Sequence, residues 1–193
     1  MTRDDDLLAA PHTGGWTGAR VVSEVDWSGR DLSRLDPTGF RFLRVRLRGA
    51  DLRFVRLLGA RAQQCDLSAS NLERVDATGS ELTEAFFDRT VLDGATLAGV
   101  TASDASFVAA SLRGVDLRGA KLLRVSFAHA ALDGAQFSDA ELSSANLHRA
   151  SGWTGASANL SCANLRLTDV ELAAAEAWMP SDDRRRSSRA CFP

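Results

Sequence analysis

The sequence of 193 residues has no tyrosine, and it contains only three cysteines, two methionines and four prolines. The cysteines are Cys65, Cys162 and Cys191, and they form no CxxC pair. This spacing indicates neither a zinc site nor a disulfide framework. No apolar run reaches the length of a signal peptide or of a membrane-spanning helix, so we expect a cytoplasmic protein without membrane contact.

Motifs for catalysis or cofactor binding are lacking as well. The three histidines are His12, His129 and His148, and none has the spacing of a metal-ligand pair. The glycines form neither a GxxxxGK nor a GxGxxG phosphate-binding motif. We therefore expect that the protein is not an enzyme and binds no cofactor and no metal.

What the sequence does contain is a period of five residues. Counting every fifth position from Trp27 to Leu147 as the centre of a unit gives an unbroken series of 25 units. Of these central positions, 20 are Leu or Phe. The exceptions are Trp27, Pro37, Ala62, Ala77 and Ala102. An amphipathic helix needs a period near 3.6 and a half-buried strand a period of 2, so neither explains the pattern.

The other positions of the unit are also restricted. The position two before each centre is mostly small, as at Ala50 and Cys65, so we expect Cys65 in the core and not as a nucleophile. Asp or Asn often precedes the centre, as at Asp51 and Asn71, and Gly often lies two residues after it, as at Gly59. One unit cannot bury its apolar residues alone, so stacked units must supply the core.

These residues resemble the pentapeptide-repeat family, whose unit reads roughly A(D/N)Lxx. Here the unit occurs as ADL at 50–52, as CDL at 65–67 and as ANL at 145–147. The resemblance implies an all-β fold, a right-handed quadrilateral β-helix in which four pentapeptides make one coil and the Leu, Phe and small residues point inward.

Taking every fourth central position sorts the series into four columns, one for each face of such a helix. One column consists of Leu52, Leu72, Leu92, Leu112 and Leu132. Another contains Phe87, Phe107 and Phe127 in succession, which predicts an internal aromatic stack. An alanine centre such as Ala77 or Ala102 fills less volume, so we expect the core to be thinner there or filled by a neighbour.

The two ends of the repeat predict the domain organisation. We expect an N-terminal segment over 1–19 and a solenoid over 20–168, followed by a C-terminal helix and tail. Within the solenoid, the repeat is regular over 25–147, loses its phase at 148–157 and resumes over 158–167.

The same five letters, GWTGA, occur at 15–19 and at 152–156, on either side of the regular repeat. We interpret both copies as turns in which Trp16 and Trp153 cover the open ends of the apolar core. The alternative is a paired aromatic contact site for a partner.

Thr168 and Glu171 form a T-x-x-E capping box, which predicts a short α-helix over 169–179 that ends before Pro180. One side of this helix carries Val170, Ala174, Ala177 and Trp178. An open solenoid end must be capped, and capping is one role for the helix. The other is a homodimer through the C-terminal end, which the family resemblance implies. We expect the tail over 180–193 to be disordered and to bind no nucleic acid.

Charge is distributed unevenly along the repeat. Residues 27–70 contain nine Arg and four Asp, a net charge of +5, whereas residues 71–147 contain 11 acidic and six basic residues, a net charge of −5. Charges that lie four units apart stack on successive coils, where opposite signs attract weakly. Three such ladders are predicted: Asp36–Arg56–Asp76, Arg53–Glu73 and Asp93–Arg113–Asp133.

Within the family, the opening VDWSGRDLSRL at 25–35 and the terminal helix are similar to the Qnr/Mfp-type branch. This resemblance implies a DNA-mimic-like factor that binds DNA gyrase or topoisomerase IV and protects it from quinolone or natural-product poisons. The acidic half supplies the candidate partner-binding residues, which are Glu81, Glu84, Asp88, Asp93, Asp104 and Asp116. The alternatives are a protein-interaction scaffold with a different partner and the assembly of rods through their oppositely charged halves.

Overall fold

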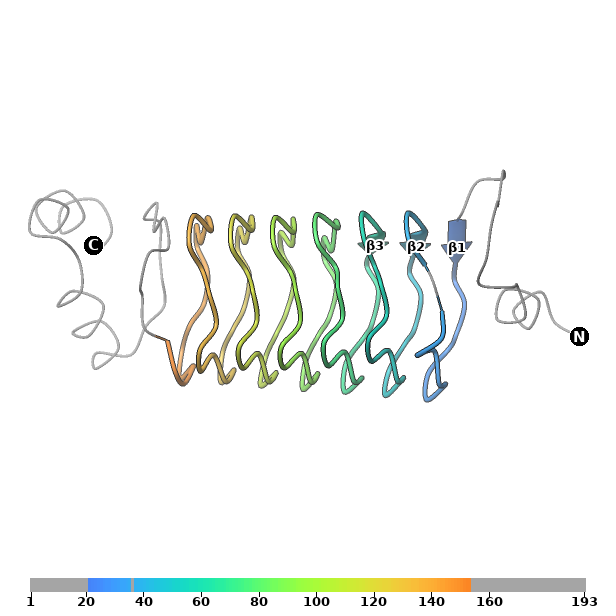
Figure 1. The fold of residues 1–193 in the computed structure, drawn as a ribbon, viewed down its shortest axis with the longest axis horizontal. Helices are drawn as coiled ribbons and strands as arrows, with labels where there is room; N and C mark the ends of the chain where they lie inside the picture. The colour runs from blue at the N-terminus through green and yellow to red at the C-terminus, as the bar shows by residue number, and fades with distance from the viewer. Residues whose placement is uncertain (1–20, 36, 154–193) are drawn as a thin grey trace, which may run out of the picture.

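The computed structural model describes residues 21–35 and 37–153. These residues form coils that stack in a straight row, with the N-terminal coil at one end of the row and the last described coil at the other (Figure 1). The strands are β1 (Val21–Ser23), β2 (Arg41–Leu43) and β3 (Arg61–Gln63). They pair in parallel in the order β1-β2-β3, so each strand lies one coil above the previous one.

The pairing register gives the size of one coil. Each backbone partner lies four repeat units further along the chain, as in Val21↔Arg41 and Arg41↔Arg61, and single bridges continue the same spacing up to Ala131↔Ser151. Four units therefore make one coil, as the columns of the sequence predict. The parallel β-solenoid is confirmed, whereas its right-handed turn stays a prediction.

Each unit ends in a tight turn. In most units the amide of the residue three after the centre donates to the carbonyl of the centre, as from Ala50 N to Leu47 O at 3.0 Å. In nearly every described unit the residue two after the centre has a positive φ, both where it is glycine (Gly49, 63°) and where it is not (Ala109, 57°). A positive φ at the third residue of such a turn defines type II, which favours glycine. The frequent glycine of the sequence repeat thus marks the corners of the coil.

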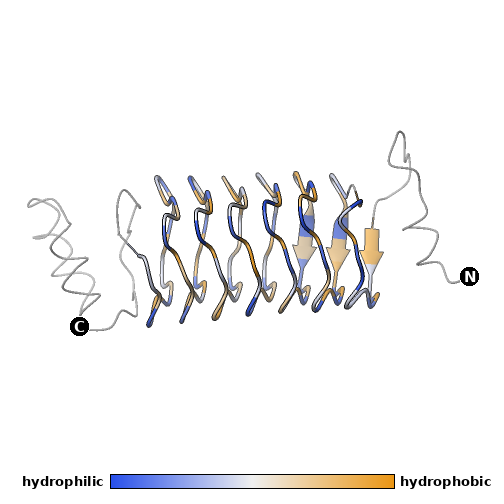
Figure 2. Ribbon diagram, turned by 60° about the horizontal axis from the view of Figure 1, so that its bottom comes forward, coloured by the Kyte–Doolittle hydropathy of each residue, from blue (hydrophilic) through white to orange (hydrophobic). Residues whose placement is uncertain are grey.

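The central and small residues fill the core. Figure 2 shows hydrophobic and hydrophilic residues interspersed along every coil. The predicted aromatic stack is present: the ring centroids of Phe87 and Phe107 lie 4.7 Å apart, and those of Phe107 and Phe127 lie 5.3 Å apart. Near Ala62 and Ala77, the core encloses an apolar cavity of about 30 Å³, so neighbouring side chains fill most of the volume that these alanines leave.

The ladder extends beyond the regular segment that the sequence predicts. Val22 is a buried centre one unit before Trp27, and Ser151 still pairs with Ala131. Residues 148–151 therefore continue the last coil, because their backbone follows the register of the coil below. Four predicted segments and part of the break lie outside the described residues. These segments are 1–19, the resumed repeat at 158–167, the tail, and the helix with Val170, Ala174, Ala177 and Trp178. Over the described range no helix is long and apolar enough to cross a membrane.

Candidate functional site: the outer faces of the rod

We name the four outer faces of the rod by their central residues. Face 1 follows Trp27, Leu47 and Leu67 to Leu147; face 2 follows Leu32, Leu52 and Leu72 to Leu132; face 3 follows Pro37, Leu57 and Ala77 to Phe137; face 4 follows Val22, Phe42 and Ala62 to Leu142. On each coil a face presents one outward residue before its centre and one after it, and the residue two after the centre lies at the corner. A partner meets only these three positions, because the remaining two are buried in the core.

The structure distributes the predicted acidic residues over all four faces. Glu81 lies on face 4, with Glu84 and Asp104 at its corner towards face 1. Asp88 and Asp93 lie on faces 1 and 2, and Asp116 lies on face 3. Only Glu84 and Asp104 stack directly on successive coils, so the six residues do not form one continuous acidic stripe.

The three acidic residues of face 4 have partners on the same face. Glu81 Oε1 lies 3.2 Å from Arg61 Nη2, and Gln64 Nε2 donates to Glu84 Oε2 at 2.8 Å. Arg124 donates two hydrogen bonds to Asp104, and this hydrogen bonding lowers the pKa of the Asp104 carboxyl below its usual value. The anionic character of face 4 is therefore partly compensated within the rod.

The other three predicted acidic residues are held by their neighbours as well. Ser106 Oγ and the Val108 amide donate to Asp88 Oδ1, whereas Ser111 Oγ and the Arg113 amide donate to Asp93 Oδ1.

Asp116 forms an ion pair with Arg118 at 2.7 Å, and hydrogen bonding from Arg118 lowers the pKa of Asp116. Each predicted acidic residue thus has a hydrogen-bond or ion-pair partner inside the rod, and it would have to exchange or share this partner on binding.

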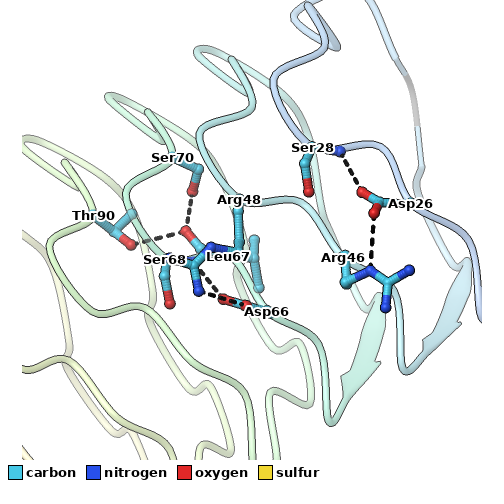
Figure 3. Close-up of polar contacts among 9 residues, drawn as sticks. All are labelled: Asp26, Ser28, Arg46, Arg48, Asp66, Leu67, Ser68, Ser70 and Thr90. Atoms are coloured by element: carbon cyan, nitrogen blue, oxygen red, sulfur yellow. Dashed lines mark hydrogen bonds and ion pairs between the residues drawn. The ribbon is translucent and has the colours of Figure 1, made fainter.

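The basic half carries a similar set of polar contacts (Figure 3). Hydrogen bonds from the Ser28 side chain and backbone, followed by one from Arg46, lower the pKa of Asp26 to about 2. Arg46 Nε donates to Asp26 Oδ2 at 2.9 Å, and Arg48 Nη1 lies 3.4 Å from Asp66 Oδ2. Surface ion pairs of this kind contribute little stability each. Their main effect is on how much charge the outer faces leave unpaired for a partner.

The corner between faces 1 and 2 has an internal polar contact (Figure 3). Ser70 Oγ and Thr90 Oγ1, both buried, donate to the same carbonyl oxygen, that of Leu67. These hydroxyls satisfy the backbone at small-residue positions. They are structural, and no partner can reach them.

Of the predicted charge ladders, Asp93–Arg113–Asp133 is confirmed, with nitrogen–oxygen distances of 3.9 and 3.8 Å. Arg53 and Glu73 attract each other as predicted, since the charge of Glu73 contributes to the raised pKa of Arg53. The direct contact of Arg53 is with Asp51, a two-nitrogen contact with Nη2 at 2.7 Å from Oδ2.

Glu73 lies 3.8 Å from its neighbour Arg74. Asp51 and Arg53 flank the same buried leucine and point outward together, so they meet more easily than residues on two coils. In the remaining ladder, Asp36 lies outside the described residues.

Two histidines that are distant in sequence come together near the last coils. The ring centroids of His129 and His148 lie 5.8 Å apart, with the rings perpendicular. The sequence did not reveal this pair, because the two histidines occupy different positions of the repeat unit. His129 lies at a corner, two residues after its centre, whereas His148 lies one residue after its centre, so the two do not belong to the same column. Among residues 21–35 and 37–153 no group of three His, Cys, Asp or Glu side chains could hold a metal ion.

Cys65 is buried in a small-residue position, and burial raises the pKa of its thiol to about 11. Trp153 packs edge-on against Phe137, with ring centroids 4.9 Å apart, at the C-terminal end of the described core. Trp16 lies outside the described residues.

Five exposed hydrophobic side chains were not singled out by sequence reasoning. They are Val21, Phe54, Phe86, Val91 and Leu123. Phe54 is the most exposed of them, at 59%, and it has a φ of 61°. The local signal was present, since Phe54 occupies the corner position where glycine is frequent.

Comparison with known proteins relates the repeat to a described family. The family model for pentapeptide repeats matches eight copies, over residues 38–68, 70–107 and 110–149, which is more than half of the chain. No curated protein matches the sequence.

Among solved structures, a trypsin-treated form of QnrB1, described as a plasmid-mediated fluoroquinolone resistance protein, is similar in fold. Its TM-score is 0.61 at 16% identity, and the match covers 91% of this chain and 98% of QnrB1. Full-length QnrB1 has a TM-score of 0.55 at 13% identity, with 81% of this chain and 98% of that chain covered. HetL, a pentapeptide repeat protein involved in heterocyst differentiation regulation in the cyanobacterium Nostoc, is 29% identical over 67% of this chain and 75% of its own, with a TM-score of 0.28.

Proposed function

The chain belongs to the pentapeptide-repeat family, and on this premise we propose that it is a non-enzymatic rod that binds another protein through its outer faces. The observation that carries the proposal is that the inward and outward positions of each unit serve different purposes. The central and small residues are buried along nearly the whole described rod, so the outward positions are free to specify a partner. In solenoids such extended surfaces commonly serve binding.

As the partner we propose DNA gyrase or topoisomerase IV, which the protein would protect from quinolone or natural-product poisons. The support is the similarity in fold to QnrB1 along nearly the full length of both chains, together with the net negative charge of residues 71–147. Cytoplasmic location and a homodimer through the C-terminal end belong to the same proposal. In the DNA-mimic form of this proposal, the Glu84–Asp104 corner of face 4 makes the first contact with a basic surface, since it stacks two carboxylates on successive coils.

The test is a supercoiling assay with purified gyrase, with and without a fluoroquinolone. We expect the protein to inhibit supercoiling or to restore it in the presence of the drug. The double variant Glu84→Gln/Asp104→Asn should weaken this effect, because it removes two negative charges from one corner. The matched control is Asp76→Asn/Asp139→Asn, which removes two charges from face 3 and its corner. If the wild-type protein changes neither supercoiling nor drug sensitivity at micromolar concentration, a topoisomerase is not its partner.

A second candidate is a scaffold for a protein other than a topoisomerase. It is favoured by the pairing of every predicted acidic residue within the rod and by their distribution over four faces, which weakens any imitation of the DNA backbone. Cross-linking in cells followed by identification of the attached peptides would separate the two candidates. A partner cross-linked to outward residues that is not a topoisomerase, and that binds again when purified, supports the scaffold.

A further inference from the structure

Face 2 carries a row of charges in which opposite signs face each other when a second copy of the rod lies against it with the reverse coil order. The outward residues after its centres are Arg53, Glu73, Asp93, Arg113 and Asp133, on five successive coils. In a second copy running the opposite way, with the coil of Asp93 as the midpoint, Arg53 faces Asp133 and Glu73 faces Arg113. Because a symmetric contact uses each pair twice, four pairs of opposite charge result.

This arrangement follows from a simple symmetry operation. A two-fold axis along the strands of face 2, through the coil of Val91 and Asp93, reverses the coil order but returns each column of residues to itself. The coils stack in a straight row (Figure 1), and the bridges keep a constant spacing of one coil. A register that fits at the midpoint therefore continues to fit towards both ends of the face.

An exposed hydrophobic residue lies at the midpoint. Val91 is the outward residue before the centre on this coil, it is 38% exposed, and the axis brings it against its own copy. One coil away, Asn71 faces Ser111, and both residues are uncharged. The column before the centres is thus uncharged around the axis, with one exposed hydrophobic residue at its midpoint, and the charge pairs lie on the coils around it. Depletion of charge towards the middle is a feature of protein interfaces.

Phe54 provides a second, independent observation. It lies at the corner of face 2, where the later coils have Gly94, Gly114 and Gly134, and its φ of 61° is unfavourable for a bulky side chain. In the reversed copy Phe54 faces Gly134, whose missing side chain leaves room for a ring. The exposure of this aromatic side chain is explained if its ring lies over this bare corner.

One contact of this register brings like charges together, since Asp93 meets its own copy. Its charge is compensated within each rod. Ser111 Oγ donates to it at 2.6 Å and the Arg113 amide at 3.1 Å, and Arg113 Nη1 lies 3.9 Å from its second oxygen. The two flanking arginines, one from each copy, lie beside the axis.

We propose that face 2 is the interface of a side-by-side, antiparallel homodimer. At ordinary strand spacings, the face from Leu32 to Leu132 measures roughly 30 Å by roughly 12 Å, which is small for a stable dimer. The dimer is therefore weak and is strengthened at low salt, where its four charge pairs are least screened. It is distinct from the end-to-end dimer proposed above and leaves both ends of the rod free, so the two contacts together would join the rods into larger assemblies.

Face 4 provides the control. Its residues Arg61, Glu81, Lys121 and Glu141 also alternate in sign around a midpoint. The outward residues of that midpoint are Thr101, Ser103 and Asp104, and the exposed hydrophobic residues of face 4, Val21 and Leu123, lie on other coils. Charge alone would allow either face, whereas charge together with Val91 and Phe54 selects face 2.

The test is the sedimentation of the full chain over a range of concentrations and salt. Arg53→Glu and Asp133→Arg should each weaken dimerisation about tenfold or more, since each places like charges opposite one another twice. The combined variant restores opposite charges and should recover the wild-type dissociation constant within about threefold. Arg61→Glu makes the same charge change on face 4 and should have no such effect. Circular dichroism confirms that each variant is folded.

A cross-linking experiment tests the midpoint. In a background of Cys162→Ser and Cys191→Ser, a cysteine introduced by Val91→Cys should be joined to its copy by a short bismaleimide. The same reagent should join Ser111→Cys far more slowly, because that position and its copy lie two coils apart along the rod.

Any of three results overturns the proposal. These are a monomer at every concentration at low salt, a dimer that Arg53→Glu and Asp133→Arg leave unchanged, and equal cross-linking at positions 91 and 111. A dimer that is lost only when residues 169–179 are deleted would place the interface at the C-terminal end instead.

Discussion

The stack of three phenylalanines provides the sharpest test of the core. Phe107 is 1% exposed, and its ring lies between those of Phe87 and Phe127 on the neighbouring coils, at 4.7 and 5.3 Å. Replacement of a buried phenylalanine by alanine costs about 3–5 kcal/mol. Because Phe107 also loses a ring contact on both sides, we expect Phe107→Ala to cost about 4–5 kcal/mol. Domains commonly have only about 5–15 kcal/mol of stability, so this is a severe loss.

The loss should also change how the rod unfolds. Each coil of a solenoid contacts only its neighbours, so a defect in the middle weakens the coupling of the coils on either side. Urea unfolding followed by circular dichroism should show a lower midpoint for Phe107→Ala and a shallower transition. Phe107→Leu keeps most of the volume, and we expect it to cost only about 1–2 kcal/mol.

The control is Phe86→Ala, which removes the same side chain from an exposed position next to Phe87, on the neighbouring coil. It should change the free energy of unfolding by no more than about 0.5 kcal/mol. The reasoning is refuted if Phe107→Ala costs less than about 1 kcal/mol, or if Phe86→Ala costs as much.

Three further predictions concern the corners, the thiol and the carboxylates. Gly99→Ala should cost about 1 kcal/mol in urea unfolding, since its φ of 65° disfavours a Cβ although no atom lies within 4 Å of one. Cys65, with a thiol pKa of about 11, should react with an aromatic disulfide reagent only as fast as the protein unfolds. The pKa of Asp26 is lowered from 3.8 to about 2, so its contribution to stability is complete above pH 3.8 and is lost as the pH falls through about 2. Asp26→Asn should therefore flatten the dependence of unfolding on pH over that range.

The inward half of the structure was predictable from the sequence because a strict period leaves it little freedom. Once each coil consists of four units, the stacking of Phe87 on Phe107 follows from their spacing alone. The ladder Asp93–Arg113–Asp133 follows in the same way.

The outward half was less predictable, because exposed side chains choose among several neighbours. Arg53 reaches Asp51 on its own coil instead of Glu73 on the next, and His129 meets His148 across two columns. The exposure of Phe54 depends on its place at a corner, where the backbone turns the side chain away from the core.

The same regularity explains why a net charge or a count of carboxylates says little about the partner of this rod. Alternating charges on successive coils stabilise one rod from within, and when the coil order is reversed they also match a second rod. A row of charges can therefore be satisfied internally, as Asp93 is by Arg113, and still bias the choice of a partner. What distinguishes one face from another is the uncharged residue at its centre. On face 2 that residue is the exposed Val91, whereas on face 4 it is Thr101, so a hydrophobic side chain at the centre of the charge pattern marks the contact.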